Sequence, residues 1–491
     1  MIASVAIQIP LLSMKPEFRT LCQQLKLQAQ VFPCQEFGVQ PGVWEVQNSI
    51  RLGSTEVEQV NAVIEACCAL LDLEARLERG HSDDLTQTMN LDLGVPKGAP
   101  AAPVGGVPGT GEEEYPGFPA DLCPAEMPDL SRHNNVMAEI LMNDPSIYQQ
   151  LKELRTPLGV SFARCIKPGV DTAGHSFFKM LGASAGDEHC YDLFGRLFEP
   201  IIARRQQQPP NLALAGPVEA ENVVSVQVSL ERNLSTLHFT PAMSLEERWK
   251  VEEILCSALA ELPEDFAGEY FRLRGNQQSS GSRLPELTEA QEAELSAEKW
   301  LFEAPDAPWI LSTGRARHWP KARGVFLSKS KELAAWINDE NHLRLIVRRA
   351  ADLKAAVELL YRAEEALSSS LAKQGHHFAR SERLGFLTSC PSDLGAAFRA
   401  KLRSALPLLG SEIGFSKVTR ALGVQAKRVL HSEGHWDVSL SSSLVLDPSE
   451  HCSAQVNLLL FAIHELSDME RRLSCGEQLD LASEAERFQA R

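Results

Sequence analysis

Cys390 stands where residue types and spacing first suggest chemistry. The apolar run LGFLT at residues 384–388 predicts a buried strand that ends just before it. Pro391 follows, and proline is typical of the first position of a helix. A cysteine at a helix N-terminus is favoured as a thiolate, because the helix dipole and the free N–H groups stabilise negative charge. Two interpretations stay open at this point: an activated thiol, or an inert core cysteine.

The elements around this cysteine predict an α+β protein. Residues 223–229 alternate as a half-buried strand does, and residues 336–347 predict two strand segments around a polar turn. Runs rich in Leu, Glu and Ala predict helices over 244–261, 287–301 and 351–371. The chain must therefore bring strands and helices together around residue 390.

The charge and the cysteine content limit the partners of this chain. It has 48 basic and 65 acidic residues in 491, a net charge of −17. That balance argues against binding to nucleic acid or to a membrane surface, although a local basic pocket can still exist. The 11 cysteines show no CxxC pair and no zinc spacing, and no apolar run is long enough to cross a membrane. We expect a cytoplasmic protein without disulfides.

The chain contains an internal repeat. Residues 1–80 align in order with residues 401–480, and Trp44-Glu45-Val46 corresponds to Trp436-Asp437-Val438. The segments 59–77 and 455–473 share nine of nineteen residues, and each has the apolar spacing of an amphipathic helix. The first copy is too short to bury a full core alone.

Composition divides the rest of the chain into segments. Residues 86–125 and 206–221 lack apolar periodicity and predict linkers, the first of them rich in Pro and Gly. Residues 126–205 predict short helices joined by Gly and Pro turns. Residues 222–480 form a larger domain, and residues 481–491 are expected to be a tail.

Several motifs place this organisation in a family. LTSCPSDLG, at residues 387–395, closely resembles the cysteine signature of the creatine kinase family, the ATP:guanidino phosphotransferases or phosphagen kinases. HNN followed by MA, GVD followed by GH, and AGDE, all within 126–205, resemble landmarks of that family's N-terminal domain. The resemblance implies a small, all-helical N-terminal domain, a larger domain of antiparallel sheet flanked by helices, and a possible homodimer. By the same resemblance, residues 1–85 are a partial copy of the C-terminal part of the catalytic domain.

The resemblance also assigns ligands and catalytic roles. Glu340, in Asn338-Asp339-Glu340-Asn341-His342, matches the family's catalytic carboxylate, and Cys390 matches its substrate-tuning thiolate. The implied ligands are ATP or ADP with Mg²⁺, for which no direct protein ligand is expected, and a guanidino compound such as creatine. Without the resemblance, Glu340 would be interpreted as a solvated turn carboxylate.

Other positions match the family's binding residues. Arg344 and Arg399 match arginines that bind the nucleotide phosphates. A guanidinium group suits this role because it can donate two parallel hydrogen bonds to a phosphate. Arg428 and Asp437 lie in a segment similar to its nucleotide loop, which also contains Glu433, a possible second carboxylate facing the guanidino group. Ser184 lies where an apolar residue shapes the substrate pocket. The plain alternative for each arginine is a surface ion pair.

The chain also departs from the family pattern. Gln227 and Ser229 stand where a strand motif has two arginines, Lys299 replaces a nucleotide-stacking histidine, and Asp393 adds a negative charge that should raise the pKa of Cys390. Each lost charge-assisted hydrogen bond removes about 1.5–3 kcal/mol. Two losses correspond to a factor of about 10²–10⁴ in rate or affinity. Two functions stay open: an impaired guanidino kinase, or an inactive pseudoenzyme that keeps the fold for nucleotide or protein binding.

Overall fold

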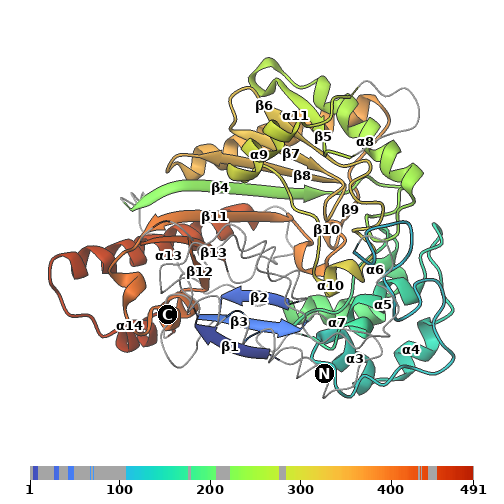
Figure 1. Cartoon of the computed structure of the whole chain (residues 1–491), viewed down its shortest axis with the longest axis horizontal. Coiled ribbons are helices and arrows are strands. Elements are labelled where there is room, and N and C mark those ends of the chain that lie inside the picture. Colours follow the sequence, from blue (N-terminus) through green and yellow to red (C-terminus); the bar gives the residue numbers. More distant parts are fainter. Residues whose placement is uncertain are drawn as a thin grey trace. The chain divides into compact units, whose positions relative to one another are not determined.

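The chain divides into two compact units, Met1–Val104 and Gly105–Arg491 (Figure 1). The structure is a computed structural model. It describes residues 4–8, 27–31, 43–48, 67, 70, 107–174, 179–205, 222–275, 284–429, 432, 434–440 and 451–489.

The first unit contains a three-stranded antiparallel sheet. Its strands are β1 (Ser4–Gln8), β2 (Leu27–Val31) and β3 (Val43–Asn48), in the order β1-β3-β2. Ile7 pairs with Trp44 in this sheet as Ser404 pairs with Trp436 in the second unit. The segments that align in sequence therefore share strand order and register. The helix predicted over 59–77 lies outside the described residues apart from Cys67 and Leu70.

Short helices form the first part of the second unit. They are α3 (Val136–Asn143), α4 (Ser146–Leu151), α5 (Phe162–Asp171), α6 (Cys190–Leu193) and α7 (Gly195–Arg205). The side chains of Asn135 and Ser161 cap α3 and α5 by accepting backbone N–H groups. Phe162 and Phe194 are fully buried in the shared core. The predicted all-helical domain is confirmed.

The segment before these helices is attached to the helical core by a few buried side chains, although most of its residues are exposed. Phe118 and Cys123 are buried in the helical core, and Glu114 lies 2.6 Å from Arg164. Within 86–125, residues 107–125 are therefore largely exposed, as their composition predicts, but Phe118 and Cys123 anchor them to the core of the helical domain.

An eight-stranded antiparallel sheet forms the rest of the second unit, in the order β12-β13-β11-β4-β8-β7-β6-β5. Its strands are β4 (Val223–Arg232), β5 (Gly268–Arg272), β6 (Gly324–Ser328), β7 (Leu333–Ile337), β8 (Leu343–Arg349), β11 (Phe398–Ala405), β12 (Val424–Arg428) and β13 (His435–Leu440). A separate two-stranded sheet pairs β9 (Arg380–Ser381) with β10 (Gly385–Phe386). The predicted antiparallel sheet is confirmed.

Helices flank the larger sheet. They are α8 (Leu245–Ala260), α9 (Glu289–Ala297), α10 (Pro308–Leu311), α11 (Leu353–Lys373), α12 (Phe415–Ala421), α13 (His451–Ser474) and α14 (Leu481–Gln489), with 3₁₀ turns η2 (Glu264–Phe266), η3 (Pro391–Asp393) and η4 (Leu409–Ser411). The residues expected to be a tail contain α14, whose Leu481 and Phe488 are buried in the main core. That expectation is wrong for 481–489, because α14 has an apolar face.

The central strand β4 contributes residues to both faces of the sheet, one packed on the core and one opposite to it. Val226, Val228 and Leu230 are buried in the core that α8, α11 and α13 also form. Alternate residues of a strand point to opposite faces, so Gln227, Ser229 and Glu231 lie on the other side. This second face carries the polar side chains of the candidate site.

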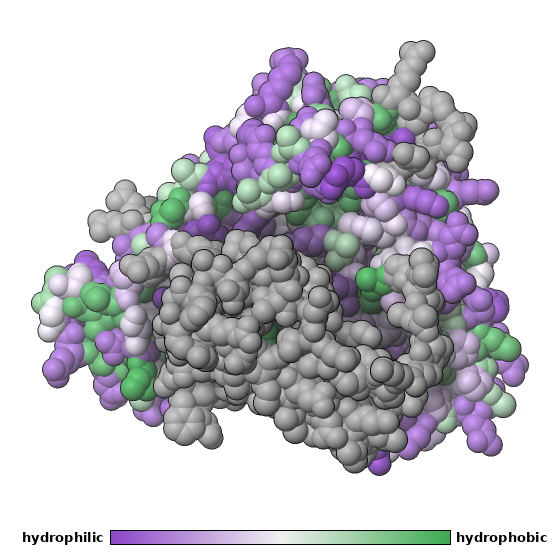
Figure 2. Space-filling model, viewed as in Figure 1, coloured by the Kyte–Doolittle hydropathy of each residue, from purple (hydrophilic) through white to green (hydrophobic). Residues whose placement is uncertain are grey.

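The described helices include none that is long and apolar enough to cross a membrane. In the view of Figure 2, hydrophilic residues cover much of the described surface. The most exposed large apolar side chain among them is Ile413, at 91%.

Leu360, fully buried on α11, should be essential to this packing. Leu360→Ala removes core contacts and leaves a cavity, so we expect it to lower the free energy of unfolding by about 2–5 kcal/mol. Lys354→Ala on the exposed side of the same helix should change it by less than about 0.5 kcal/mol. Urea titration followed by circular dichroism measures both, and equal effects would contradict the packing of α11.

Candidate active site

The turn between β7 and β8 holds Glu340 in place from both of its ends. Asn338 starts the turn with a φ of 57°, a conformation that asparagine tolerates, and its amide donates to two backbone carbonyls at 3.0 and 2.7 Å. His342 ends the turn: Nδ1 accepts a backbone N–H at 2.9 Å, and Nε2 donates to the His238 carbonyl at 2.8 Å. Burial lowers the pKa of His342 to about 4, so the neutral ring keeps both bonds at pH 7.

Asn341 ties this turn to the segment that carries Cys390. Its Oδ1 accepts the backbone N–H of Ser389 at 2.8 Å, and its Nδ2 donates to the carboxylate of Glu231. The Ser389 hydroxyl lies 3.1 Å from the carbonyl oxygen of Glu340. One buried amide thus links three segments that are far apart in the sequence.

Glu340 forms an ion pair with Arg315. Arg315 Nη1 lies 2.9 Å from Glu340 Oε2, and the two side chains are only 15% and 25% exposed. Burial alone would raise the pKa of Glu340, but the charges of Arg315, Arg399 and Arg344 outweigh it and hold that pKa below its usual range. Glu340 is therefore ionised at pH 7. Sequence analysis missed Arg315, because the segment after α10 contains no motif that marks it.

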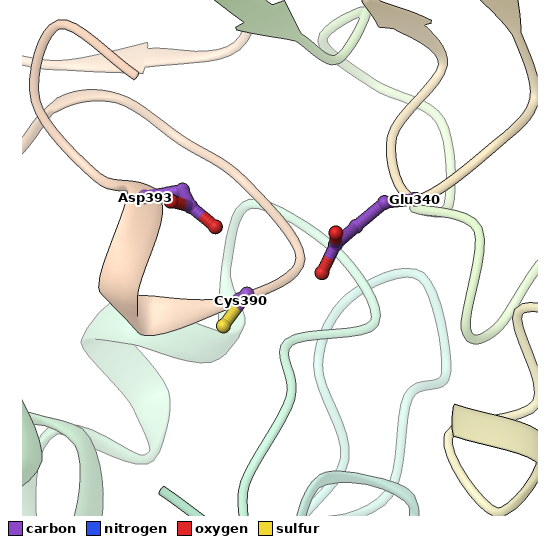
Figure 3. A group of neighbouring side chains, drawn as sticks. All are labelled: Glu340, Cys390 and Asp393. Atoms are coloured by element: carbon purple, nitrogen blue, oxygen red, sulfur yellow. The ribbon is translucent and has the colours of Figure 1, made fainter. Parts of the chain in front are cut away.

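Cys390 lies between Glu340 and Asp393, whose side chains reach toward it from two sides (Figure 3). The thiol sulfur and one oxygen of each carboxylate lie within 4.8 Å of one another. Burial, followed by the charges of Asp393 and Glu340, raises the pKa of the Cys390 thiol to about 12. The direction predicted for the effect of Asp393 is confirmed, and the site favours the protonated thiol over the expected thiolate.

The local structure around Cys390 explains this correction. Of the apolar run at 384–388, only Gly385–Phe386 form a strand, β10. After Cys390 comes η3, a 3₁₀ turn of three residues, and no long helix. A helix of this length contributes little dipole, so burial, followed by the charges of the two carboxylates, determines the protonation of the thiol.

One face of the large sheet carries the arginines predicted to bind phosphate. Arg399 on β11 pairs in register with Ser229 on β4, and Arg344 on β8 pairs with Glu231. Directly paired residues share a face, and further residues at a spacing of two along each strand share it too. The cations on this face are Arg344 and Arg348 from β8, and Arg399, Lys401 and Arg403 from β11.

Carboxylates offset part of this positive charge. Asp393 holds Arg399, whose Nη2 lies 2.6 Å from each of its carboxylate oxygens. Asp437 likewise holds Arg403, with Nε 2.8 Å from Oδ1, and lies 3.3 Å from Lys401. With Glu231, three carboxylates face five cations, so the face keeps an excess of positive charge.

Glu231 is the second charged residue that sequence analysis missed. Its side chain is 2% exposed, and Oε1 lies 3.8 Å from Arg344 Nε. Burial and the charge of Glu340 raise the pKa of Glu231 to about 7, although Arg344 and Arg399 act in the opposite direction. The alternating pattern predicts a strand only to Ser229, whereas β4 continues to Arg232 and so includes Glu231.

The remaining predicted residues lie in different places. Ser184 is buried beside the Cys390 segment, since the N–H of the next residue donates to the Ser389 carbonyl at 2.8 Å. Asp437 lies on the basic sheet face. Arg428 is exposed at the end of β12, and no ion pair joins it to the other site residues among those described. Glu433 lies outside the described residues.

A helical domain followed by a larger antiparallel sheet flanked by helices is the phosphagen kinase fold. The half-buried carboxylate of Glu340 lies beside the arginine-rich face of that sheet. The chain belongs to the ATP:guanido phosphotransferase family. The sequence model of that family's C-terminal catalytic domain matches residues 1–77 and 250–438. The model of its N-terminal domain matches residues 131–203.

Individual relatives show the same likeness. The flagellar creatine kinase of Strongylocentrotus purpuratus is 28% identical over 499 residues, covering 97% of this chain but only 39% of that protein. A crystal structure of lombricine kinase superposes with a TM-score of 0.63 and 29% identity, over 72% of this chain and 97% of the other. The substrate-free duplicated taurocyamine kinase of Schistosoma mansoni shares the fold, with a TM-score of 0.57 and 23% identity over 96% of this chain and 61% of that one.

Removing the partner of Glu340 should change its proton affinity. In Arg315→Met, burial opposes ionisation with one cation fewer, so we expect the pKa of Glu340 to rise. Carboxyl ¹³C NMR across a pH titration measures it, with the resonance assigned by its absence in Glu340→Gln. Arg317→Met is the control, because Arg317 pairs with Glu114 instead. An unchanged pKa in Arg315→Met would contradict the electrostatic role of the ion pair.

Cys390 should react slowly with iodoacetamide at pH 8. A thiol with a pKa of about 12 holds far less thiolate than an ordinary one, so we expect alkylation at least about 100-fold slower than at the exposed Cys475. Asp393→Asn should accelerate it by removing a nearby negative charge. Peptide mass spectrometry over time gives both rates in one sample. Equal rates at Cys390 and Cys475 would show that the thiol is activated.

Proposed function

We propose that this chain transfers the γ-phosphoryl group between MgATP and a guanidino compound such as creatine, at a reduced rate. The observation that carries the proposal is the position of ionised Glu340 beside a sheet face with five cations. Phosphoryl transfer depends on positioning and on charge stabilisation rather than on covalent chemistry, and these residue types supply both.

The proposed reaction assigns one task to each group. A guanidino nitrogen attacks the γ-phosphorus, the bond from phosphorus to the β-bridging oxygen breaks, and the attacking nitrogen loses a proton. Glu340 orients that nitrogen and accepts the proton, since it is ionised at pH 7. Arg344 and Arg399 bind the phosphate oxygens. Cys390 contributes a neutral thiol to the substrate side of the site.

Magnesium fits this site as part of the nucleotide. The carboxylates of Glu340 and Asp393 are engaged by Arg315 and Arg399, and the Cys390 thiol is protonated, so these groups make a poor ligand set for a hard cation. When bound with ATP, Mg²⁺ would neutralise charge on the β- and γ-phosphate oxygens.

The loss of two arginines from β4 supports the reduced rate. Gln227 accepts a hydrogen bond from Arg348 at 2.9 Å, and Arg348 also donates to the carbonyls of Glu298 and Lys299. Neither Gln227 nor Ser229 can bind a phosphate as a guanidinium does. We expect a cost of about 10²–10⁴ in rate or affinity on the scale of two charge-assisted hydrogen bonds.

The proposal extends to the organisation of the chain. Residues 126–205 act as the N-terminal domain, 222–480 as the catalytic domain, and 1–85 as a partial copy of its C-terminal part. The equal register of the two three-strand sheets supports the last assignment. A homodimer and a cytoplasmic location are further proposals, supported by the family resemblance and by the free thiols of the described cysteines.

A pseudoenzyme that binds nucleotide or protein is the second candidate. It is favoured by the internal partners of the site, because Glu340, Arg399 and Arg344 each already face an opposite charge. A substrate must replace these partners before it can bind.

Phosphorus NMR of the purified chain with MgATP and a panel of guanidines separates the two functions. We expect a new phosphagen resonance that disappears in Glu340→Gln, because the variant cannot accept the proton. Glu364→Gln is the matched control, since Glu364 lies on the other face of the sheet and pairs with Arg232. A folded protein that binds MgADP but forms no phosphagen would overturn the kinase and leave the pseudoenzyme.

A further inference from the structure

The strand β4 runs between the two strands that carry the phosphate-binding arginines. Glu231 pairs in register with Arg344 of β8, and two residues earlier Ser229 pairs with Arg399 of β11. Glu231 therefore lies on the basic face, between the neighbouring strands that contribute these two cations. Along this row β4 presents Gln227, Ser229 and Glu231, which together carry a negative charge.

The carboxylate of Glu231 is held in the site but incompletely bonded. Oε2 accepts the amide of Asn341, the residue after Glu340. Oε1 is buried and has no hydrogen-bond partner, and Arg344 Nε, 3.8 Å away, has none either. A buried carboxylate oxygen without a hydrogen bond is costly, so the position of Oε1 beside Arg344 needs an explanation other than hydrogen bonding. Electrostatic attraction to the cations around it is the interaction that this position does provide.

We propose that Glu231 determines the affinity of this face for polyphosphate, acting as an internal counter-ion of Arg344 and Arg399 that competes with a bound nucleotide. The inference rests on the proposed nucleotide site, and it identifies Glu231 as the residue that lowers the affinity of that site. An incoming phosphate meets cations whose field Glu231 has already reduced, and it must approach a buried carboxylate of its own sign.

The same carboxylate should make binding depend on pH. The charged groups that face Glu231 are Arg344 and Arg399 on the neighbouring strands, with Glu340, Asp393 and Arg315 around them. Burial raises the pKa of Glu231 to about 7, whereas Glu340 stays ionised from pH 6 to 8. Glu231 gains its negative charge as the pH rises through that window. Affinity for a phosphate ligand should therefore fall from pH 6 to pH 8.

Calorimetric titration of the full chain with MgADP at pH 8 tests the proposal. We expect Glu231→Gln, which keeps the shape and removes the charge, to lower the Kd at least about tenfold. In the wild-type chain the Kd should rise from pH 6 to pH 8 as Glu231 ionises. In Glu231→Gln we expect this contribution to the pH dependence of the Kd to be absent. Glu364→Gln should match the wild type, since its partner Arg232 lies on the other face of β4.

The outcomes separate this inference from the proposed function. A Kd in Glu231→Gln that equals or exceeds that of the wild type would overturn the proposed counter-ion role of Glu231, even if phosphagen is formed. A lower Kd without any phosphagen supports the counter-ion and counts against the kinase. If the variant does not fold, the wild-type chain is heated with sodium sulfate, whose charge is the same at pH 6 and 8. A larger rise in Tm at pH 6 supports the proposal, and an equal rise overturns it.

Discussion

Charges that leave water must be paired, and this requirement organises the candidate site. Removing an ion from water costs several kcal/mol unless an opposite charge and hydrogen bonds compensate for it. Glu340 meets Arg315, Arg399 meets Asp393, and Glu231 lies near Arg344. Glu340 lies 2.9 Å from its arginine, whereas Glu231 lies 3.8 Å from its own. The pKa values of the two acids therefore differ: that of Glu340 is lowered, and that of Glu231 is raised to about 7. The same field keeps Cys390 a thiol.

The helical domain takes part in holding these charges in position. The hydroxyl of Tyr191 donates to the carbonyl of Thr388 at 2.7 Å, and Leu387 and Leu394 are buried in the helical core. The short segment with Cys390 therefore rests on one domain while its side chains face the sheet of the other. Asn341 completes the connection from the sheet side. Geometry at the site thus depends on contacts between the two domains.

The fold could be predicted from the sequence to a large extent because periodicity and motifs report it directly. The strand around Val226 follows from alternation, and the two strand segments predicted around a polar turn in 336–347 correspond to β7 and β8. The protonation of Cys390 was harder to predict: the effect of nearby Asp393 follows from the sequence, but the burial of the thiol and its proximity to Glu340 arise only on folding. Arg315 and Glu231 were missed for the same reason. A side chain's partner across a sheet or in a distant loop leaves no local pattern in the sequence.

The two-residue period of β4 has a consequence for how such a protein can diverge. Val226, Val228 and Leu230 maintain the core, whereas Gln227, Ser229 and Glu231 determine what the opposite face attracts. Substitution at the second set leaves the buried apolar surface untouched. The residues of β4 that maintain the fold are therefore not the residues that determine its ligand preference. Substitutions on the polar face can remove or restore an anion site during evolution while the protein stays folded.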